Sequence, residues 1–205
     1  MFIENKWAQQ IQVFVEKVKK FFMNDGKSIE LSDDANSCIR MTFAGQYSAG
    51  KSSIIKMLTG RSDISVGAGI TTQKVLRYDW DGIEVIDTPG IHTKLRPDHD
   101  AVSYQAIVSA DLLVYVITNE LFDAYIAEQF RKLAIEADRA SEMVLVVNKM
   151  DRTANGNSRE QQMVIRDDLR KVLAPYTPEQ FNLVFLDAES YLDGKDENDP
   201  ELAKE

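Results

Sequence analysis

The sequence predicts an α/β fold built on a mostly parallel six-stranded sheet, with one antiparallel strand and helices on both faces. From residue 39 onward, short apolar runs alternate with longer segments of helical periodicity, a pattern typical of a parallel sheet that is covered on both sides. Asp81-Gly82 separates two of these runs, and this dipeptide favours a two-residue hairpin between antiparallel strands. With 205 residues, 44% of them hydrophobic, the chain is long enough for one globular domain with a sizeable core.

The N-terminal segment, residues 1–37, is predicted as a flanking amphipathic helix followed by a connector. The helix ends near residue 24. Its apolar stripe comprises Ile3, Trp7, Ile11, Phe14, Val18, Phe21 and Phe22. We expect this stripe to pack against the domain or against another helix. The cluster of Lys17, Lys19 and Lys20 leaves contact with a membrane surface as the less common alternative.

Six apolar runs in the rest of the chain are predicted as strands. They cover residues 39–44, 73–80, 83–86, 112–118, 143–147 and 183–186. Helices are predicted between them at residues 50–58, 102–109, 121–137 and 159–173. These elements define one predicted domain over residues 38–189.

The last stretch, residues 187–205, carries eight acidic residues against Lys195 and Lys204 and is predicted to be a loop or a solvated tail. Because no clear amphipathic helix follows the sixth strand, the outer face of that strand is expected to lack a cover within this chain. Residues 190–205 are therefore interpreted as an acidic tail that begins a region continuing in a longer protein.

The composition argues against several classes of protein. Thirty-three acidic residues against twenty-four basic ones give a net charge of −9, so we expect no nucleic acid partner. No apolar run approaches the ~18 residues of a transmembrane helix. Cys38 is the single cysteine, cannot form an internal disulfide, and indicates no oxidising compartment. We expect a cytoplasmic protein and leave peripheral contact with a membrane open.

A phosphate-binding loop is predicted directly after the first strand. It matches the pattern G-x-x-x-x-G-K-[ST] without a departure and comprises Gly45, Gln46, Tyr47, Ser48, Ala49, Gly50, Lys51 and Ser52. The glycines let the backbone wrap around an anion, toward which the amides of the following helix point. Lys51 adds a full charge near the β- and γ-phosphates, and Ser52 is expected to hold Mg²⁺.

The sequence Asp-Thr-Pro-Gly at residues 87–90 follows the third strand. Asp87 can bind Mg²⁺ through water, and the Gly90 amide can meet the γ-phosphate. Such a short pattern is weak alone, but its place after a strand and downstream of a phosphate loop favours a nucleotide site.

The glycine-rich segment 66–73 leads into the second strand and is typical of a loop that closes on bound nucleotide. One of its threonines should reach Mg²⁺. We prefer Thr72, with Thr71 as the alternative.

Residues 148–151, Asn-Lys-Met-Asp, follow the fifth strand and are predicted to recognise the base. The Asp151 carboxylate can accept two parallel hydrogen bonds from the ring N–H and exocyclic amine of guanine, a pair of donors that adenine lacks on that edge. A wrong base would leave buried polar groups unpaired. Lys149 would lay its alkyl stem along the nucleotide. With the phosphate loop, Asn148, Lys149 and Asp151 predict a site for GTP and GDP.

The order of these motifs resembles that of the TRAFAC class of GTPases over about residues 39–189. The run Ser-Ala-Gly-Lys-Ser-Ser at residues 48–53 is similar to the dynamin superfamily, especially its bacterial dynamin-like members, and adds Ser53 to the nucleotide contacts. The resemblance implies a Ras-like fold, Mg²⁺-dependent GTP hydrolysis and a homodimer of G domains across the nucleotide. It also implies a neck helix in the position of the N-terminal helix, and lipid contact through regions outside this chain.

The resemblance leaves open which residue positions the attacking water. Ile91 and His92 stand where Ras-like switches carry their glutamine, so His92 is one alternative. The phosphate-loop glutamine of dynamins corresponds to Tyr47, one residue after Gln46.

Other site residues are also implied by the resemblance. Ser48 matches the dynamin serine that stabilises developing charge together with a bound Na⁺ or K⁺. Lys51, Ser48 and Thr72 are therefore the expected catalytic residues. The last base-contacting element would lie at residues 187–189, where Asp187 is interpreted as a nucleotide contact.

The expected function is slow GTP hydrolysis that G-domain dimerisation activates and that is coupled to membrane remodelling or vesicle-related processes. Two alternatives remain open. One is a ribosome- or RNA-associated GTPase switch, which the acidic balance of the chain disfavours. The other is a scaffold that binds GTP without hydrolysing it, which the missing catalytic glutamine motivates.

Overall fold

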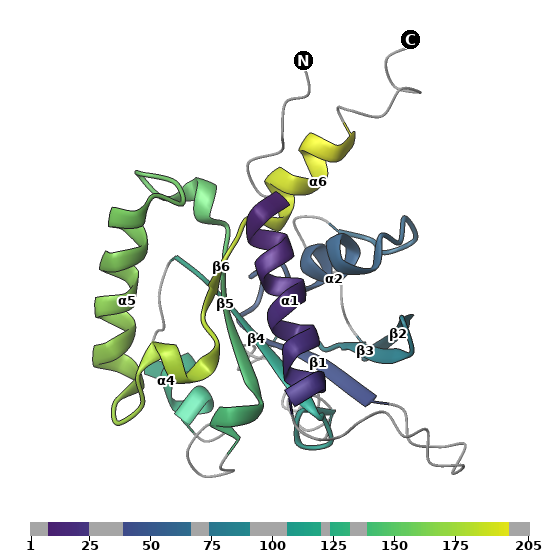
Figure 1. Ribbon diagram of the computed structural model, residues 1–205, viewed down its shortest axis with the longest axis horizontal. Helices are drawn as coiled ribbons and strands as arrows, with labels where there is room; N and C mark the ends of the chain where they lie inside the picture. The colour runs from purple at the N-terminus through teal and green to yellow at the C-terminus, as the bar shows by residue number, and fades with distance from the viewer. Residues whose placement is uncertain are drawn as a thin grey trace.

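The structure is a computed structural model and describes residues 8–24, 39–66, 74–90, 106–119, 124–131 and 139–196. Its centre is a six-stranded sheet with strand order β2-β3-β1-β4-β5-β6 (Figure 1). The strands are β1 (Ile39–Gly45), β2 (Leu76–Trp80), β3 (Ile83–Asp87), β4 (Leu112–Thr118), β5 (Met143–Asn148) and β6 (Val184–Phe185). β2 runs antiparallel to β3, and the other pairings are parallel. The predicted sheet and its hairpin are confirmed.

The central strands form the core of the molecule. Every residue of β4 and β5 is buried, which explains why their sequences are continuous apolar runs up to the polar residue that ends each strand, Thr118 or Asn148. Strand β2 lies at an edge, and its residues are exposed or half-buried. It begins at Leu76, later than predicted, and residues 67–73 lie outside the described part of the chain.

Helices cover both sides of the sheet (Figure 1). On one side lie α1 (Ala8–Asn24), α2 (Lys51–Thr59) and α6 (Ala188–Asp196), and on the other α4 (Ala124–Arg131) and α5 (Arg159–Leu173). Helix α5 has the predicted bounds. Within the helix predicted at 102–109, residues 106–108 are helical and 102–105 are not described; α4 is the described part of the helix predicted at 121–137.

Helix α1 packs at the β6 end of the sheet. Phe14 and Val18 on its inner face are fully buried, and Lys17 Nζ donates a hydrogen bond to the Leu183 carbonyl oxygen at 2.9 Å. Burial, helped by the positive charge of Arg166, lowers the pKa of Lys17. The prediction that the sixth strand lacks a cover is therefore wrong, because the N-terminal helix supplies one.

Helix α6 occupies part of the segment that was predicted as a loop or solvated tail. Asp187 caps its first turn, since the Asp187 Oδ1 atom accepts the Ser190 N–H at 3.0 Å. Tyr191 and Leu192 are partly buried against the core, and the helix contacts α2. The prediction failed because only Ala188, Tyr191 and Leu192 repeat at helical spacing among acidic and small residues.

Candidate functional site

The predicted site lies where neighbouring parallel strands end. β1 ends at Gly45, β3 at Asp87 and β5 at Asn148. The carboxyl ends of parallel strands meet at one edge of a sheet, which is where open α/β sheets bind their ligands. The fold therefore gathers the phosphate loop, the 87–90 segment and the 148–151 segment at one place.

The phosphate loop passes so close to its neighbours that its glycines have no room for a side chain. Gly45 has a φ of 124°, and a Cβ atom there would lie 2.1 Å from the Val116 carbonyl oxygen. Gly50 has a φ of 87°, and a Cβ atom there would lie 2.4 Å from Asn148 Nδ2. Ser48 also has a positive φ, of 58°. Both motif glycines are thus required by the backbone conformation and by close packing.

Lys51 opens helix α2 and directs its amine back to the phosphate loop. The residue is 6% exposed, and its Nζ atom donates to the carbonyl oxygens of Gln46 at 2.9 Å and Gly45 at 3.4 Å. Burial lowers the pKa of Lys51 to about 8, although the negative charge of Asp87 acts in the opposite direction. A phosphate in this loop would raise that pKa again, because a nearby anion favours the charged amine.

We expect the affinity for GDP to fall as the pH rises through about 8. The phosphates bind the charged form of Lys51, so above its pKa the affinity should fall by up to about tenfold per pH unit. Titrations of GDP between about pH 7 and 9 measure this slope. In Lys51→Arg the side chain stays charged over that range, so the affinity should not depend on pH. Equal slopes in the two proteins would contradict this role of Lys51.

Ser52 and Asp87 offer oxygen ligands that suit Mg²⁺. The Ser52 hydroxyl donates to Asp87 Oδ2 at 2.7 Å, and Asp87 is fully buried at the end of β3. Mg²⁺ prefers hydroxyl, carboxylate and phosphate oxygens and usually keeps several waters. The described residues contain no group of three His, Cys, Asp or Glu side chains that could hold a metal, so the phosphates and water would complete the coordination.

Gly90 lies closer to the phosphate loop than a residue with a side chain could. A Cβ atom on Gly90 would lie 2.7 Å from Tyr47 Cα and 3.1 Å from Tyr47 N. The chain leading there is anchored by Thr88, whose hydroxyl donates to the Phe43 carbonyl oxygen at 2.7 Å. The backbone of residue 90 therefore lies directly against the phosphate loop, and its amide contact to the terminal phosphate stays a prediction.

Asn148 connects the phosphate loop to the loop that follows β6. Its side chain is buried, Nδ2 donates to the Ala49 carbonyl oxygen at 2.8 Å, and Oδ1 accepts the Ala188 N–H at 3.0 Å. The sequence places Asn148 among the nucleotide contacts, and the structure gives it this bridging role as well. It fixes the separation between the parts of the site expected to hold the phosphates and the base.

Replacing Asn148 by alanine is expected to lower the free energy of unfolding by about 2–3 kcal/mol, because it leaves a buried carbonyl and a buried N–H without their partner. Urea denaturation of the nucleotide-free chain measures the change. Asn155→Ala, at an exposed position, should change the free energy by less than about 0.5 kcal/mol. A loss in Asn148→Ala no larger than in this control would contradict the bridging role.

The residues expected to recognise the base lie on a short turn after β5. Lys149 has a φ of 62°, and Met150–Arg152 form a single 3-10 turn. The Asp151 N–H donates to Asp187 Oδ2 at 3.1 Å, and Asp187 is buried. The structure thus brings Asp187 to the main chain of Asp151.

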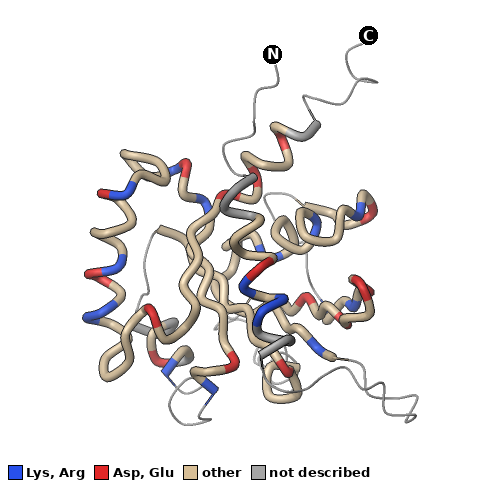
Figure 2. Tube along the Cα trace, viewed as in Figure 1, with Lys and Arg blue, Asp and Glu red and all other residues tan. Residues whose placement is uncertain are grey.

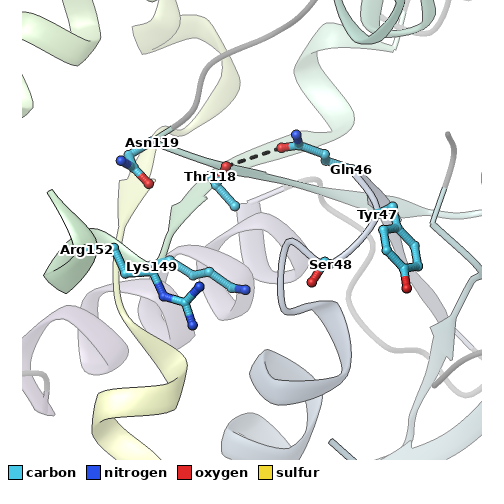
Figure 3. A pocket seen from close by; sticks show the side chains of 7 residues that line it. All are labelled: Gln46, Tyr47, Ser48, Thr118, Asn119, Lys149 and Arg152. Carbon is cyan, nitrogen blue, oxygen red and sulfur yellow. Dashed lines mark hydrogen bonds between the residues drawn. The ribbon is translucent and has the colours of Figure 1, made fainter. Parts of the chain in front are cut away.

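A hollow of about 200 Å³ lies beside the phosphate loop (Figure 3). It is lined by Gln46, Tyr47, Ser48, Thr118, Asn119, Lys149 and Arg152. Figure 3 shows the side chains of Lys149 and Arg152 extending toward Ser48, and the Thr118 hydroxyl donates to Gln46 Oε1 at 3.3 Å. Sequence reasoning missed Thr118, Asn119 and Arg152. The place of Thr118 at the carboxyl end of β4, beside β1, was the available signal.

Four residues that the sequence analysis considered for the nucleotide site lie outside the described part of the chain. They are Thr71, Thr72, Ile91 and His92. The Mg²⁺ contact assigned to Thr72 and the water-positioning alternative at His92 therefore stay predictions.

Several known proteins resemble this chain in sequence. A family model described as "50S ribosome-binding GTPase" matches residues 40–149, more than half of the chain. GTPase Der of Thermosipho africanus is 21% identical over 202 residues, which cover 92% of this chain and 45% of that protein. GTPase Der of Thermosipho melanesiensis is 26% identical over 194 residues, covering 88% and 44%. The chain spans less than half the length of these curated relatives.

Solved structures with the same fold come from several kinds of GTPase. LeoA, a bacterial dynamin GTPase from ETEC, has a TM-score of 0.59 at 21% identity and covers 95% of this chain and 40% of its own. Era in complex with MgGDPNP and part of 16S ribosomal RNA has a TM-score of 0.57 at 22% identity, covering 77% and 54%. Toc33 from Arabidopsis thaliana has a TM-score of 0.57 at 18% identity, covering 89% and 82%. At these identities the likeness establishes a common Ras-like fold.

Proposed function

This chain belongs to the 50S ribosome-binding GTPase family, and we propose that it hydrolyses GTP as the GTPase domain of a bacterial dynamin-like protein. The observation that carries the proposal is helix α1, which precedes the GTPase domain and packs on it through Phe14, Lys17 and Val18. A docked helix in this position is what a dynamin-like neck would provide. The shared fold with LeoA over 95% of the chain supports the same assignment.

In the proposed reaction, water attacks the γ-phosphate in line with the leaving group. A bond forms between the water oxygen and the γ-phosphorus, and the bond to the β,γ-bridging oxygen breaks. Lys51 and the main-chain amides of the loop and of Gly90 stabilise the charge that develops on the phosphate oxygens. Bound Mg²⁺ supplies further charge neutralisation, and its proposed protein ligands are Ser52, Asp87 and Thr72.

Activation is proposed to come from pairing of two GTPase domains across the nucleotide, with a monovalent cation held near Ser48. Turnover per molecule should then rise with protein concentration, and it should be faster in K⁺ or Na⁺ than in a salt of a large organic cation. Phosphate release from the 205-residue chain tests both points when it is measured over a hundredfold range of protein concentration and in each of these salts. A rate that stays constant over that range would argue against activation by dimerisation.

A ribosome- or RNA-associated switch is the second candidate, and the family description and the RNA bound to Era favour it. The basic residues at the C-terminal end of α5 speak against a nucleic acid surface there. Arg170 contacts Asp167 and Glu179, Lys171 contacts Asp168, and Figure 2 shows basic and acidic residues interspersed along the helix. The expectation of no nucleic acid partner remains a prediction.

Co-sedimentation separates the two candidates. Pelleting with purified ribosomes in GTP but not in GDP would support the switch and count against the dynamin-like assignment. The dynamin-like assignment places lipid contact and membrane remodelling in regions outside this chain, at the cytoplasmic side of a membrane. None of the described helices combines the length and apolar character needed to cross a bilayer. The third candidate, a scaffold that binds GTP without hydrolysing it, is not supported by the family match, because that family is described as one of GTPases.

A further inference from the structure

We propose that the outer edge of strand β2 is an association surface, on which a second copy of this chain adds its own β2, antiparallel and centred on Tyr78. The two sheets then continue into one another across this edge. The proposal goes beyond the pairing across the nucleotide and does not depend on it, because β2 contains no residue of the nucleotide site.

Strand β2 has a free edge. In the described sheet it pairs only with β3 and lies at one end of the strand order (Figure 1). The Thr88 N–H, directly after β3, donates to β1 at 3.4 Å, so the preceding residue, Asp87, directs its main-chain groups to Leu76 on β2. Because these directions alternate along a strand, the N–H and C=O groups of Arg77 and Asp79 point to the free edge.

The side chains of β2 divide between two faces. Leu76, Tyr78 and Trp80 lie on one face, where Leu76 is 42% exposed and the two aromatic side chains are partly buried against the core. Arg77 and Asp79 lie on the other face and are exposed. Charged side chains usually protect an edge strand against pairing. Here the two charges have opposite signs, so they can also attract a strand with the same sequence.

The sequence of β2, Leu-Arg-Tyr-Asp-Trp, is complementary to itself in the antiparallel direction. In a pair centred on Tyr78, Arg77 of each copy is opposite Asp79 of the other, and Leu76 is opposite Trp80. Arg77 and Asp79 are also the residues whose main-chain groups point outward, so each of these pairs can exchange two hydrogen bonds. A register shifted by two residues places Arg77 opposite Arg77 or Asp79 opposite Asp79. Charge therefore selects one register.

Asp79 lacks a cation within the described part of its own chain. It is directly opposite Glu84 on β3, and like charges in this position are unfavourable. Glu84 contacts Arg77 at 2.8 Å and Arg40 at 3.5 Å, whereas Asp79 forms no ion pair among the described residues. The Arg77 side chain is 56% exposed and has further N–H donors for a second carboxylate. A second copy supplies each Asp79 with an arginine.

Charge reversal tests this pairing. Arg77→Asp or Asp79→Arg alone places like charges opposite each other twice, so each variant should raise the dissociation constant of the dimer at least about tenfold. An equimolar mixture of the two variants restores opposite charges at both places and should associate like the wild type. A mixture that associates as weakly as either variant alone would overturn the proposal.

Sedimentation velocity of the GDP-bound chain measures the association. The interface is small, so we expect a wild-type dissociation constant on the order of 100 µM, within reach of a series from about 1 to 300 µM. Lys171→Asp, on the exposed face of α5, changes the net charge as much as Arg77→Asp does and should leave the constant unchanged. A wild-type chain that stays monomeric throughout would contradict the proposal, and so would an equal loss in the Lys171 control.

A disulfide crosslink tests the register. After Cys38→Ser removes the single cysteine, Tyr78→Cys places two thiols opposite each other, with Cα atoms about 4.5 Å apart and within disulfide range. Leu76→Cys lies on the same face, but in this register it is about 13 Å from its own copy. We expect mild oxidation to give a covalent, reducible dimer with Tyr78→Cys only. No dimer with Tyr78→Cys, or equal yields from the two variants, would rule out this register.

Nucleotide dependence separates this interface from the one proposed across the nucleotide. Association through β2 should be equally strong in GDP and in a non-hydrolysable GTP analogue. Association that requires the GTP analogue and ignores charge reversal at Arg77 and Asp79 would overturn this inference and leave the other interface intact. If both interfaces form, each joins two copies symmetrically at a different surface, and together they produce linear assemblies of the chain.

Discussion

Replacing Lys51 by methionine is expected to weaken GTP binding by at least about a hundredfold and to stabilise the nucleotide-free chain. The loss of affinity follows from removing a buried charge from the phosphates, an interaction worth about 3 kcal/mol or more. The gain in stability follows from the pKa of about 8, because burying the charged amine costs folding free energy. After loss of its hydrogen bonds to Gln46 and Gly45, the net gain should be on the order of 1 kcal/mol.

Two measurements on the same protein check this pair of effects. Equilibrium binding of a fluorescent GTP analogue gives the affinity, and urea denaturation without nucleotide gives the stability. Lys56→Met, one turn further along α2 at a half-buried position, should change the affinity by less than about twofold. If Lys51→Met lost affinity and stability together, Lys51 would be a structural residue rather than one whose burial is maintained for the ligand.

Replacing Asp151 by asparagine is expected to lower the affinity for GTP by about a hundredfold and to raise the affinity for xanthosine triphosphate. The carboxylate accepts from both donors of guanine, whereas the NH₂ of asparagine would face the exocyclic amine. Losing a charge-assisted acceptor and leaving a donor unpaired costs about 3 kcal/mol. Xanthine carries a carbonyl oxygen in place of that amine, so the new NH₂ group could donate to it.

Competition between the two nucleotides for the same chain measures the switch. Asp193→Asn, at an exposed position on α6, removes a carboxylate of the same kind and should leave the preference unchanged. If Asp151→Asn lowered the affinity for GTP without raising the affinity for xanthosine triphosphate, the substitution would have damaged the turn. Equal affinity of wild type and variant for GTP would remove Asp151 from the site.

The elements that could be predicted from the sequence are those whose pattern is long or local. Strand β4 and helix α5 have the predicted bounds, because six apolar residues in a row before Thr118 and a helical repeat over fifteen residues each allow one interpretation. The phosphate loop could be predicted because the local backbone conformation requires glycine at fixed positions. Its tightest contact, between Gly45 and Val116, became visible only with the sheet order.

The features that escaped prediction depend on which segments meet in space. Helix α1, at the opposite end of the chain, covers β6. The periodicity of a helix shows that it has an apolar face but does not indicate which element that face packs against. Arg152 and Thr118 border the same hollow although they come from different strands' ends. The bond between Asp187 and Asp151 joins two loops, and the sequence, from which Asp187 was predicted as a nucleotide contact, contains no signal for this partner.

The contact between Lys17 and Leu183 also sets an order of assembly, because it spans 166 positions of the chain. Helix α1 leaves the ribosome well before its docking partner, which lies 166 positions later in the chain. Until that partner is made, Phe14 and Val18 remain an exposed apolar stripe available to chaperones or to other nascent chains. Chains cut before β6 should therefore aggregate more readily than the whole domain, because α1 cannot dock until β6 has been synthesised.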